Sequence, residues 1–234
     1  ITDNFISWRP EYQDAIFECA KGVYHNGKFA SASGDTDSHL YTQSEVGKMS
    51  KRYYNVFNPD DIVADHGADT FRLYEMFLGP IEQSKPWDIK GIEGVAKFVK
   101  KFWSLFHDET AFEVSSESPS KAEYKILHQA IKKVSEDIEK FSFNTAISAF
   151  MICTNELRKL GCNKTEILKP LVKLLAPFAP FMTEELWYKL GETSSVHASK
   201  YPVFDASYLV EDQFDYPVCI NGKKRALKAF ETNA

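Results

Sequence analysis

The sequence has no run of eighteen apolar residues, and it contains few cysteines and histidines. Four of its 234 residues are cysteine and six are histidine. The cysteines form no C-x-x-C pair, and the histidines are not spaced to complete a zinc site. We therefore expect free thiols and no metal ion bound by the chain itself. The missing apolar run excludes a membrane-spanning helix, and we expect a cytoplasmic protein.

The chain also has no excess of basic over acidic residues. The chain has 28 lysines and arginines against 33 acidic residues, for a net charge of −5. This balance argues against a general polyanion binder, although a local basic surface can still hold a nucleic acid.

The two ends of the sequence lack the usual signals. The start, "ITDNFISWRPEYQ", has neither the basic residues nor the apolar stretch of a signal peptide. It does not begin with Met, and the final "AFETNA" carries no clear terminus signal. We expect a piece of a longer protein.

Two short helices are predicted where the hydrophobic period becomes helical. Asn58 suits the N-cap of a helix that starts at Pro59 and closes at Gly67. A second helix, "ADTFRLYEMFLGP", is expected to stop at Gly79-Pro80. The aromatic Trp87 in the following connector is a candidate for docking two subdomains together.

Four longer helices are predicted by apolar residues at helical spacing. They span residues 88–107, 120–140, 143–160 and 164–190. The last is expected to break near Pro177 and Pro180 and to restart at Thr183. We expect most of the aromatic residues to lie in the core; these are Trp103, Phe141, Phe143, Phe178, Phe181 and Trp187.

Both ends of the chain are predicted to be small mixed pieces. "RPEYQDAIFECAKG" predicts a short helix ending at Gly22, and "GVYHNGKFASASG" predicts a hairpin turning at Asn26-Gly27. "SASGDTDSHLYTQSEVG" is typical of a loop. "YPVCINGKKRALKAF" predicts a second hairpin around Asn221-Gly222. The predicted fold is therefore mainly α, an antiparallel helical bundle with small α+β pieces at both ends.

A lysine-rich loop, "GKMSKRYYNVFNPDDIV", directly precedes the first helix. Lys48 and Lys51 bracket small or flexible residues, so both ammonium groups can converge on one anion. Gly47 allows a close backbone approach. A cationic loop of this kind suits phosphate chemistry in which charge develops at the transition state. The pattern of a P-loop is absent.

"KMSKR", residues 48–52, resembles the K-M-S-K-S signature of class I aminoacyl-tRNA synthetases. The stretch "YNVFNPDDIVADHGADTFRLYEMFLGPIEQSKPWD" resembles the segment after that signature in bacterial leucyl-tRNA synthetases. "LAPFAPFMTEELW" resembles their helical bundle, and "INGKKR" resembles the hairpin that opens their C-terminal domain. Isoleucyl and valyl enzymes share the loop and the bundle plan, and they remain an alternative.

The resemblance implies four segments. Residues 1–46 would be part of a leucine-specific insertion, and residues 47–85 the signature loop with connecting helices. Residues 86–192 would form the tRNA-binding, anticodon-binding-type bundle, and residues 193–234 a linker with the start of the C-terminal domain.

The resemblance also implies the reaction. ATP and leucine give leucyl-adenylate and pyrophosphate, and leucine then passes to its tRNA. Lys51 would stabilise the charge that develops on the triphosphate, with Lys48 assisting. Met49 and Ser50 would shape the loop against ATP, Ser50 through its backbone N–H. Mg²⁺ would be held mostly by ATP.

Two departures from the family pattern limit what the chain does alone. Arg52 replaces the second serine of the signature. The family's H-I-G-H-type motif is absent around all six histidines, which are His25, His39, His66, His107, His128 and His197. We therefore expect the isolated chain to be inactive, with ATP and leucine bound through an N-terminal half that it lacks. A non-catalytic helical RNA-binding module is the alternative of another class.

Basic residues of the predicted bundle supply a candidate tRNA surface. The residues favoured are Lys97, Lys100, Lys101, Arg158 and Lys159, and further candidates are Lys132, Lys133, Lys164, Lys169 and Lys173. Such contacts position a tRNA stem without reading its sequence. The expected partner is a leucine-acceptor tRNA, and the expected state is a monomer. Asp69 and Arg72, three residues apart, are assigned a structural role.

Overall fold

The computed structural model describes residues 9–10, 16–19, 22–25, 28–30, 39–41, 47–51, 55–88, 91–108, 111–210, 213–220 and 223–231. The chain divides into two compact units, residues 1–65 and 66–234. Arg52, Asn26-Gly27 and Asn221-Gly222, which the sequence singled out, lie outside the described residues.

The first unit contains a four-stranded sheet. Its strands are β1 (Ile16–Cys19), β2 (Gly22–His25), β3 (Lys28–Ala30) and β4 (His39–Tyr41). They are ordered β3-β2-β1-β4, and only the β1–β4 pair is parallel. The strands of the first predicted hairpin, β2 and β3, are thus confirmed.

Two predictions for this unit were wrong. Residues 16–19 form a strand rather than the end of a helix, and residues 39–41 form a strand inside a predicted loop. Ile16 and Phe17 are good strand formers, and pairing with β2 and β4 favours a strand here over the helix that the local sequence also allowed. The partner β4 lies some twenty residues away, where local spacing carries no information about it.

Helix α2 (Pro59–His66) begins where the sequence predicted. The Asn58 Oδ1 atom accepts a hydrogen bond from the backbone N–H of Asp60 at 3.3 Å. Asp60 and Asp61 place negative charge in the first turn, at the positive end of the helix dipole. Gly67, with φ of +85°, ends the helix as expected.

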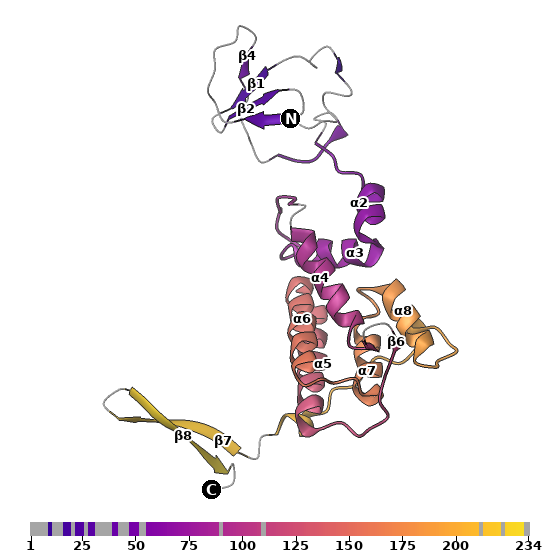
Figure 1. Ribbon diagram of the computed structural model, residues 1–234, viewed down its shortest axis with the longest axis vertical. Helices are drawn as coiled ribbons and strands as arrows, with labels where there is room; N and C mark the ends of the chain where they lie inside the picture. Colours follow the sequence, from indigo (N-terminus) through magenta and orange to yellow (C-terminus); the bar gives the residue numbers. More distant parts are fainter. Residues whose placement is uncertain are drawn as a thin grey trace. The chain divides into compact units, whose positions relative to one another are not determined.

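The second unit is a helical bundle, drawn in Figure 1 from magenta to orange. Its helices are α3 (Ala68–Phe77), α4 (Ile92–Trp103), α5 (Lys121–Glu139), α6 (Phe143–Lys159), α7 (Thr165–Leu175) and α8 (Pro180–Lys189). Helices α5 and α6 lie side by side along most of their length. The helical fold class is confirmed.

The boundaries of two helices differ from the prediction. Helix α4 ends at Trp103, and the chain then forms a small antiparallel pair, β5 (His107–Asp108) and β6 (Ala111–Phe112). Helix α8 starts at Pro180, not at Thr183. Thr183 is fully buried inside the helix, and its hydroxyl donates to the Ala179 carbonyl at 2.8 Å.

The core follows the predicted apolar stripes. Its largest fully buried side chains include Leu73, Phe102, Leu127, Phe150 and Leu168. Burial of this kind supplies most of the stabilisation of such a bundle. Cys153 and Cys162 are buried free thiols, as predicted for these two positions.

Two aromatic residues assigned to the core are instead exposed. Phe141 is 65% exposed and Phe181 is 68% exposed, whereas Phe178 and Trp187 are buried. Phe141 occupies the tight α5–α6 turn with φ of +55°, so its side chain leaves the helical stripe that the spacing assumed.

The segment after the bundle lies along α5. The ring of Tyr208 stacks on His128 at 4.4 Å and on Tyr124 at 4.6 Å between ring centroids. The backbone N–H of Asp205 donates to Nδ1 of His128 at 3.1 Å. These contacts fix residues 205–208 against α5 before the chain continues into the last two strands.

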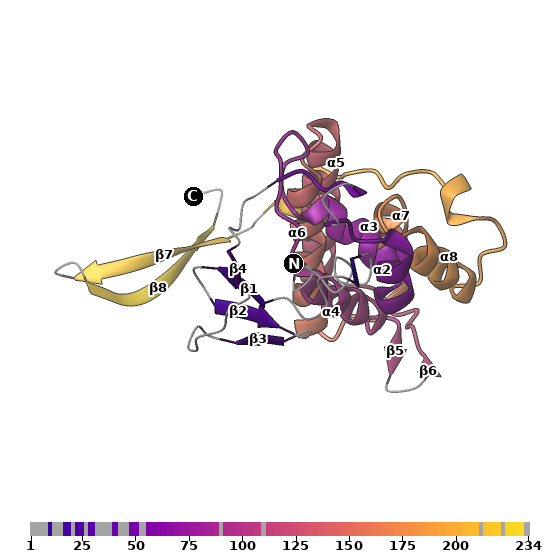
Figure 2. The same ribbon diagram turned by 90° about the horizontal axis from the view of Figure 1, so that it is seen from above.

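Strands β7 (Gln213–Ile220) and β8 (Lys223–Glu231) form an antiparallel ribbon, which Figure 2 shows in yellow. The predicted C-terminal hairpin is confirmed. Across the described residues, no helix has the length and apolar character needed to cross a membrane.

Candidate functional site

The lysine loop is the first candidate site. Lys48 and Lys51 are exposed, Met49 is 40% exposed, and Ser50 is half-buried. The two cationic side chains are therefore accessible to an anion in solution.

The side chain of Asn55 holds this loop closed. Its Oδ1 atom accepts a hydrogen bond from the backbone N–H of Ser50 at 2.8 Å. Its Nδ2 atom donates to the Lys48 carbonyl at 3.4 Å. The sequence reasoning missed Asn55, although an asparagine just after a loop is the residue type that makes such local backbone bonds. The Ser50 N–H, expected to face a nucleotide, is directed to Asn55 in this structure.

The second candidate site lies on α4 and α6. All five favoured basic residues are exposed there; they are Lys97, Lys100, Lys101, Arg158 and Lys159. The Lys101 ammonium donates to Asn155 Oδ1 at 3.2 Å, which joins the two helices. We call these five residues the α4–α6 basic face.

All five further candidate lysines have intramolecular partners. Acidic partners hold Lys133 (Asp137, 2.7 Å), Lys164 (Glu123, 3.0 Å) and Lys169 (Glu192, 2.6 Å). Lys132 and Lys173 lie over aromatic rings, those of Phe204 and Trp187. Within the basic face, Lys159 pairs with Glu156 at 2.6 Å. Among the described residues, Lys97, Lys100 and Arg158 have no such partner.

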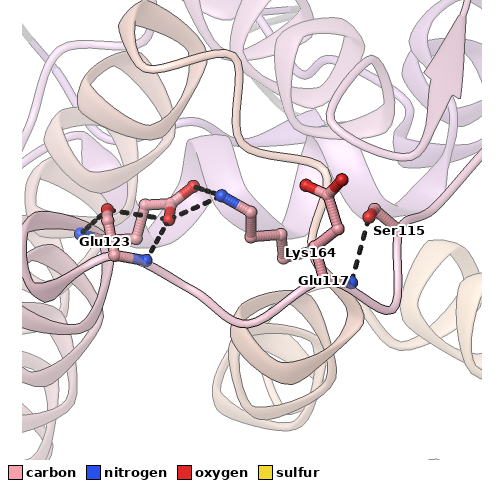
Figure 3. A network of polar contacts seen from close by, with 5 residues as sticks. Ser115, Glu117, Glu123 and Lys164 are labelled. Atoms are coloured by element: carbon pink, nitrogen blue, oxygen red, sulfur yellow. Dashed lines mark hydrogen bonds and ion pairs between the residues drawn. The ribbon is translucent and has the colours of Figure 1, made fainter.

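A buried ion pair joins the start of α5 to the start of α7, as Figure 3 shows. Glu123 is 2% exposed, and its carboxylate receives the Lys164 ammonium at 3.0 and 3.1 Å. The backbone N–H and the hydroxyl of Ser120 also donate to Glu123, at 2.6 and 2.8 Å. The Glu123 N–H donates back to the Ser120 hydroxyl, which completes a capping box.

The pKa of Glu123 reflects these contacts. Burial alone would raise the pKa, but the hydrogen bonds from Ser120 and Lys164 outweigh burial and lower the pKa to about 2. A carboxylate that stays ionised and fully hydrogen-bonded is not poised to exchange protons near neutral pH. The cluster is therefore structural.

Asp69 and Arg72 do not pair with one another. Asp69 accepts hydrogen bonds from the backbone at the start of α8, and Arg72 donates to the Pro177 carbonyl at 3.0 Å. Both side chains thus fasten α3 to the segment between α7 and α8. The ring of Trp87 packs edge-on against Phe71 and Tyr74, which fastens the connector to α3.

No metal centre is evident in the part of the chain that the structure describes, where no three His, Cys, Asp or Glu side chains form a group.

Comparisons with known proteins decide between the alternatives. Residues 123–234 match the family described as the anticodon-binding domain of tRNA ligase. The chain is 52% identical over 226 residues to the leucine–tRNA ligase of Cytophaga hutchinsonii, a match that covers 96% of this chain and 23% of that protein. It is 50% identical over 231 residues to the enzyme of Bacteroides thetaiotaomicron, covering 98% and 23%.

The chain belongs to the leucine–tRNA ligase family.

It spans less than a quarter of the length of these relatives. The described fold is also similar to a solved leucyl-tRNA synthetase (LeuRS) of Agrobacterium radiobacter K84, in a ternary complex with tRNA and LeuAMS. That match has a TM-score of 0.66 and 32% sequence identity, and it covers 84% of this chain and 28% of the solved chain. The leucyl assignment is thus confirmed over the isoleucyl and valyl alternatives.

Proposed function

We propose that this chain is the part of a leucine–tRNA ligase that holds the triphosphate of ATP and docks the tRNA. The observation that carries the proposal is the 52% identity over 226 of the 234 residues, a span too long to omit either the lysine loop or the bundle. The relatives' remaining length would supply the leucine pocket and the rest of the nucleotide site.

The lysine loop serves the first half-reaction. A carboxylate oxygen of leucine attacks the α-phosphorus of MgATP, the bond to the bridging oxygen breaks, and pyrophosphate leaves with the negative charge. The ammonium groups of Lys48 and Lys51 stabilise that charge as it develops. Mg²⁺ comes with ATP as part of the substrate and neutralises further phosphate charge.

The α4–α6 basic face serves the tRNA. Lys97, Lys100 and Arg158 carry most of the phosphate contact, because no acidic side chain of the described residues neutralises them. Lys159 contributes less since Glu156 already pairs with it. Phosphate contacts fix the register of an RNA stem and do not depend on its sequence.

A chimera tests both halves of the proposal. The matched 226 residues of this chain replace the corresponding 23% of the Cytophaga hutchinsonii enzyme, with which they share 52% identity. We expect the chimera to catalyse leucine-dependent ATP–pyrophosphate exchange, and Lys51→Ala to lower its kcat by about 100-fold with little change in the KM for leucine.

The isolated chain provides the second arm. We expect it to show no exchange activity and to bind a leucine-tRNA transcript saturably. A folded chimera without exchange activity, or an isolated chain that activates leucine, would contradict the proposal. Binding of tRNA by the isolated chain together with an inactive chimera would favour the non-catalytic RNA-binding module.

A further inference from the structure

A hollow of about 410 Å³ lies beside the ends of α4 and α6. Its polar lining comes from Ser104, His107, Asp108, Glu113, Arg158 and Asn163. This volume falls within the range of small-ligand sites, at its lower end. The lysine loop contributes nothing to this lining, and of the proposed phosphate contacts only Arg158 does.

The hollow continues the α4–α6 basic face. Lys101 and Asn155 join the two helices through their side chains at 3.2 Å. Ser104 and Arg158 each follow three residues later, about one helical turn further along. Arg158 therefore belongs to both the basic face and the hollow, so a phosphate bound to Arg158 would lie next to the opening.

The electrostatics of the hollow differ from those of the face. Two helices end there, and the C-terminal end of a helix carries partial negative charge. Asp108 and Glu113 add two carboxylates, and both are exposed. The lining thus has two carboxylates against one cation, Arg158, which disfavours a phosphate inside the hollow and favours a group rich in N–H.

His107 contributes a ring whose orientation is fixed. Its ring stacks on Trp103 at 4.4 Å, and its Nδ1 lies 3.0 Å from the Trp103 carbonyl. Because a carbonyl only accepts, Nδ1 carries the proton in this contact, which leaves Nε2 as the ring nitrogen that can meet a ligand.

Asn163 contributes both a donor and an acceptor. Its backbone carbonyl is tied to the Ser115 N–H at 2.9 Å, which fixes its position. Its side-chain amide has no hydrogen-bond partner among the described residues. A free amide of this kind pairs in a bidentate manner with an amino group next to a ring nitrogen.

We propose that this hollow takes one unpaired base of the bound RNA, and that the base presents an amino group beside a ring-nitrogen acceptor, as adenine and cytosine do. The carboxylates of Asp108 and Glu113 and the Asn163 amide oxygen accept from the amino group. The Asn163 N–H donates to the ring nitrogen, and Arg158 neutralises the attached phosphate. Uracil offers one N–H and two carbonyls, and the carbonyls face an acceptor-rich wall. The inference rests on the proposed tRNA function.

Short labelled oligonucleotides test the base preference without depending on catalysis. The affinities of A6, C6 and U6 RNA for the whole chain are compared by fluorescence anisotropy at low salt. We expect A6 and C6 to bind about fivefold to tenfold more tightly than U6. Asn163→Ala and Asp108→Asn should bring A6 and C6 to the U6 level and leave U6 binding unchanged. Asn144→Ala, at the other end of α6, is the matched control and should keep the preference.

The outcomes separate this inference from the proposed function. Equal affinities for the three oligonucleotides would overturn the proposal that the hollow binds a base. So would the absence of oligonucleotide binding while the tRNA transcript still binds. Both results would leave the proposed tRNA docking intact. A preference that survives both Asn163→Ala and Asp108→Asn in folded protein would also overturn it. Loss of tRNA binding with retained exchange activity in the chimera would instead contradict the proposal that the α4–α6 basic face binds tRNA.

Discussion

The carboxylate of Asp69 on α3 caps α8, whose first turn lies more than a hundred residues further along the chain. Its two oxygens accept hydrogen bonds from the backbone N–H groups of Phe181 at 3.2 Å and Met182 at 2.6 Å. First-turn N–H groups have no partner inside their own helix. A buried side chain of one helix thus completes the start of another and fixes how the two pack.

Replacing Asp69 by alanine should destabilise the protein. The change removes two hydrogen bonds to a buried carboxylate and leaves two N–H groups of α8 without acceptors, so we expect a loss of about 2–3 kcal/mol in the free energy of unfolding. Asp69→Asn keeps one acceptor oxygen and should lose about half as much. Urea unfolding followed by circular dichroism measures both. Asp65→Ala, at an exposed position on α2, is the control, and a loss for Asp69→Ala no larger than the control's would refute the capping role.

The Glu123–Lys164 ion pair should make the bundle sensitive to acid. Burial raises the pKa of Glu123, but the bonds from Ser120 and Lys164 outweigh burial, so the pKa falls from an ordinary 4.5 to about 2 on folding. A lowered carboxyl pKa contributes stability that is complete above pH 4.5 and is lost as pH falls toward 2. At 1.36 kcal/mol per pKa unit, the contribution is about 3 kcal/mol.

The measurement compares the pH dependence of stability in two variants. Glu123→Gln should lower stability at pH 7 and flatten its decline between pH 4.5 and 2. Glu139→Gln, exposed at the end of the same helix, should decline as the unmodified chain does. Parallel curves for the unmodified chain and Glu123→Gln would show that the pair contributes nothing.

The sequence predicted the bundle well because each helix carried its own signals. The apolar stripes of α5 and α6 are local patterns, and tertiary packing did not override them. The Asn58-Pro59 start of α2, just before the bundle, is a local signal of the same kind. The first unit was predicted less well, because β1 depends on β4, a distant strand. Contacts such as Asp69 with Met182 have no local signal at all, since they arise only when two helices meet.

The candidate sites show the same division. Lys48 and Lys51 stood out because a short motif places them, while Asn55, which holds their loop, was missed because its role lies in two backbone hydrogen bonds. The basic residues of the bundle were all visible in the sequence. Their intramolecular partners were not, so Lys164, which is fastened to buried Glu123, could not be told from Lys100, which lacks an ionic partner among the described residues.

The partners of the lysines predict which ones matter for RNA. The logarithm of the tRNA association constant should fall linearly with the logarithm of salt concentration, with a slope that counts phosphate contacts. Lys97→Ala, Lys100→Ala and Arg158→Ala should each reduce that slope by about one. Lys133→Ala and Lys169→Ala should change it little, because Asp137 and Glu192 already neutralise these side chains. Equal effects for the two groups would mean that intramolecular pairing does not select the binding surface.

Asn55 should act as a positioning residue for the lysine loop. Asn55→Ala removes the hydrogen bonds of this side chain to the Ser50 N–H and the Lys48 carbonyl. The backbone that carries Lys48 and Lys51 is then no longer held in one conformation. In the chimeric ligase we expect kcat for ATP–pyrophosphate exchange to fall about tenfold, and the KM for leucine to stay unchanged because the loop does not bind it. Asn55→Asp keeps the 2.8 Å acceptor and loses only the longer, weaker bond, so it should recover most of the rate. If Asn55→Asp is as slow as Asn55→Ala, the hydrogen bond to the Ser50 N–H does not support the rate. If both variants keep the kcat of the unmodified chimera, Asn55 does not position the loop.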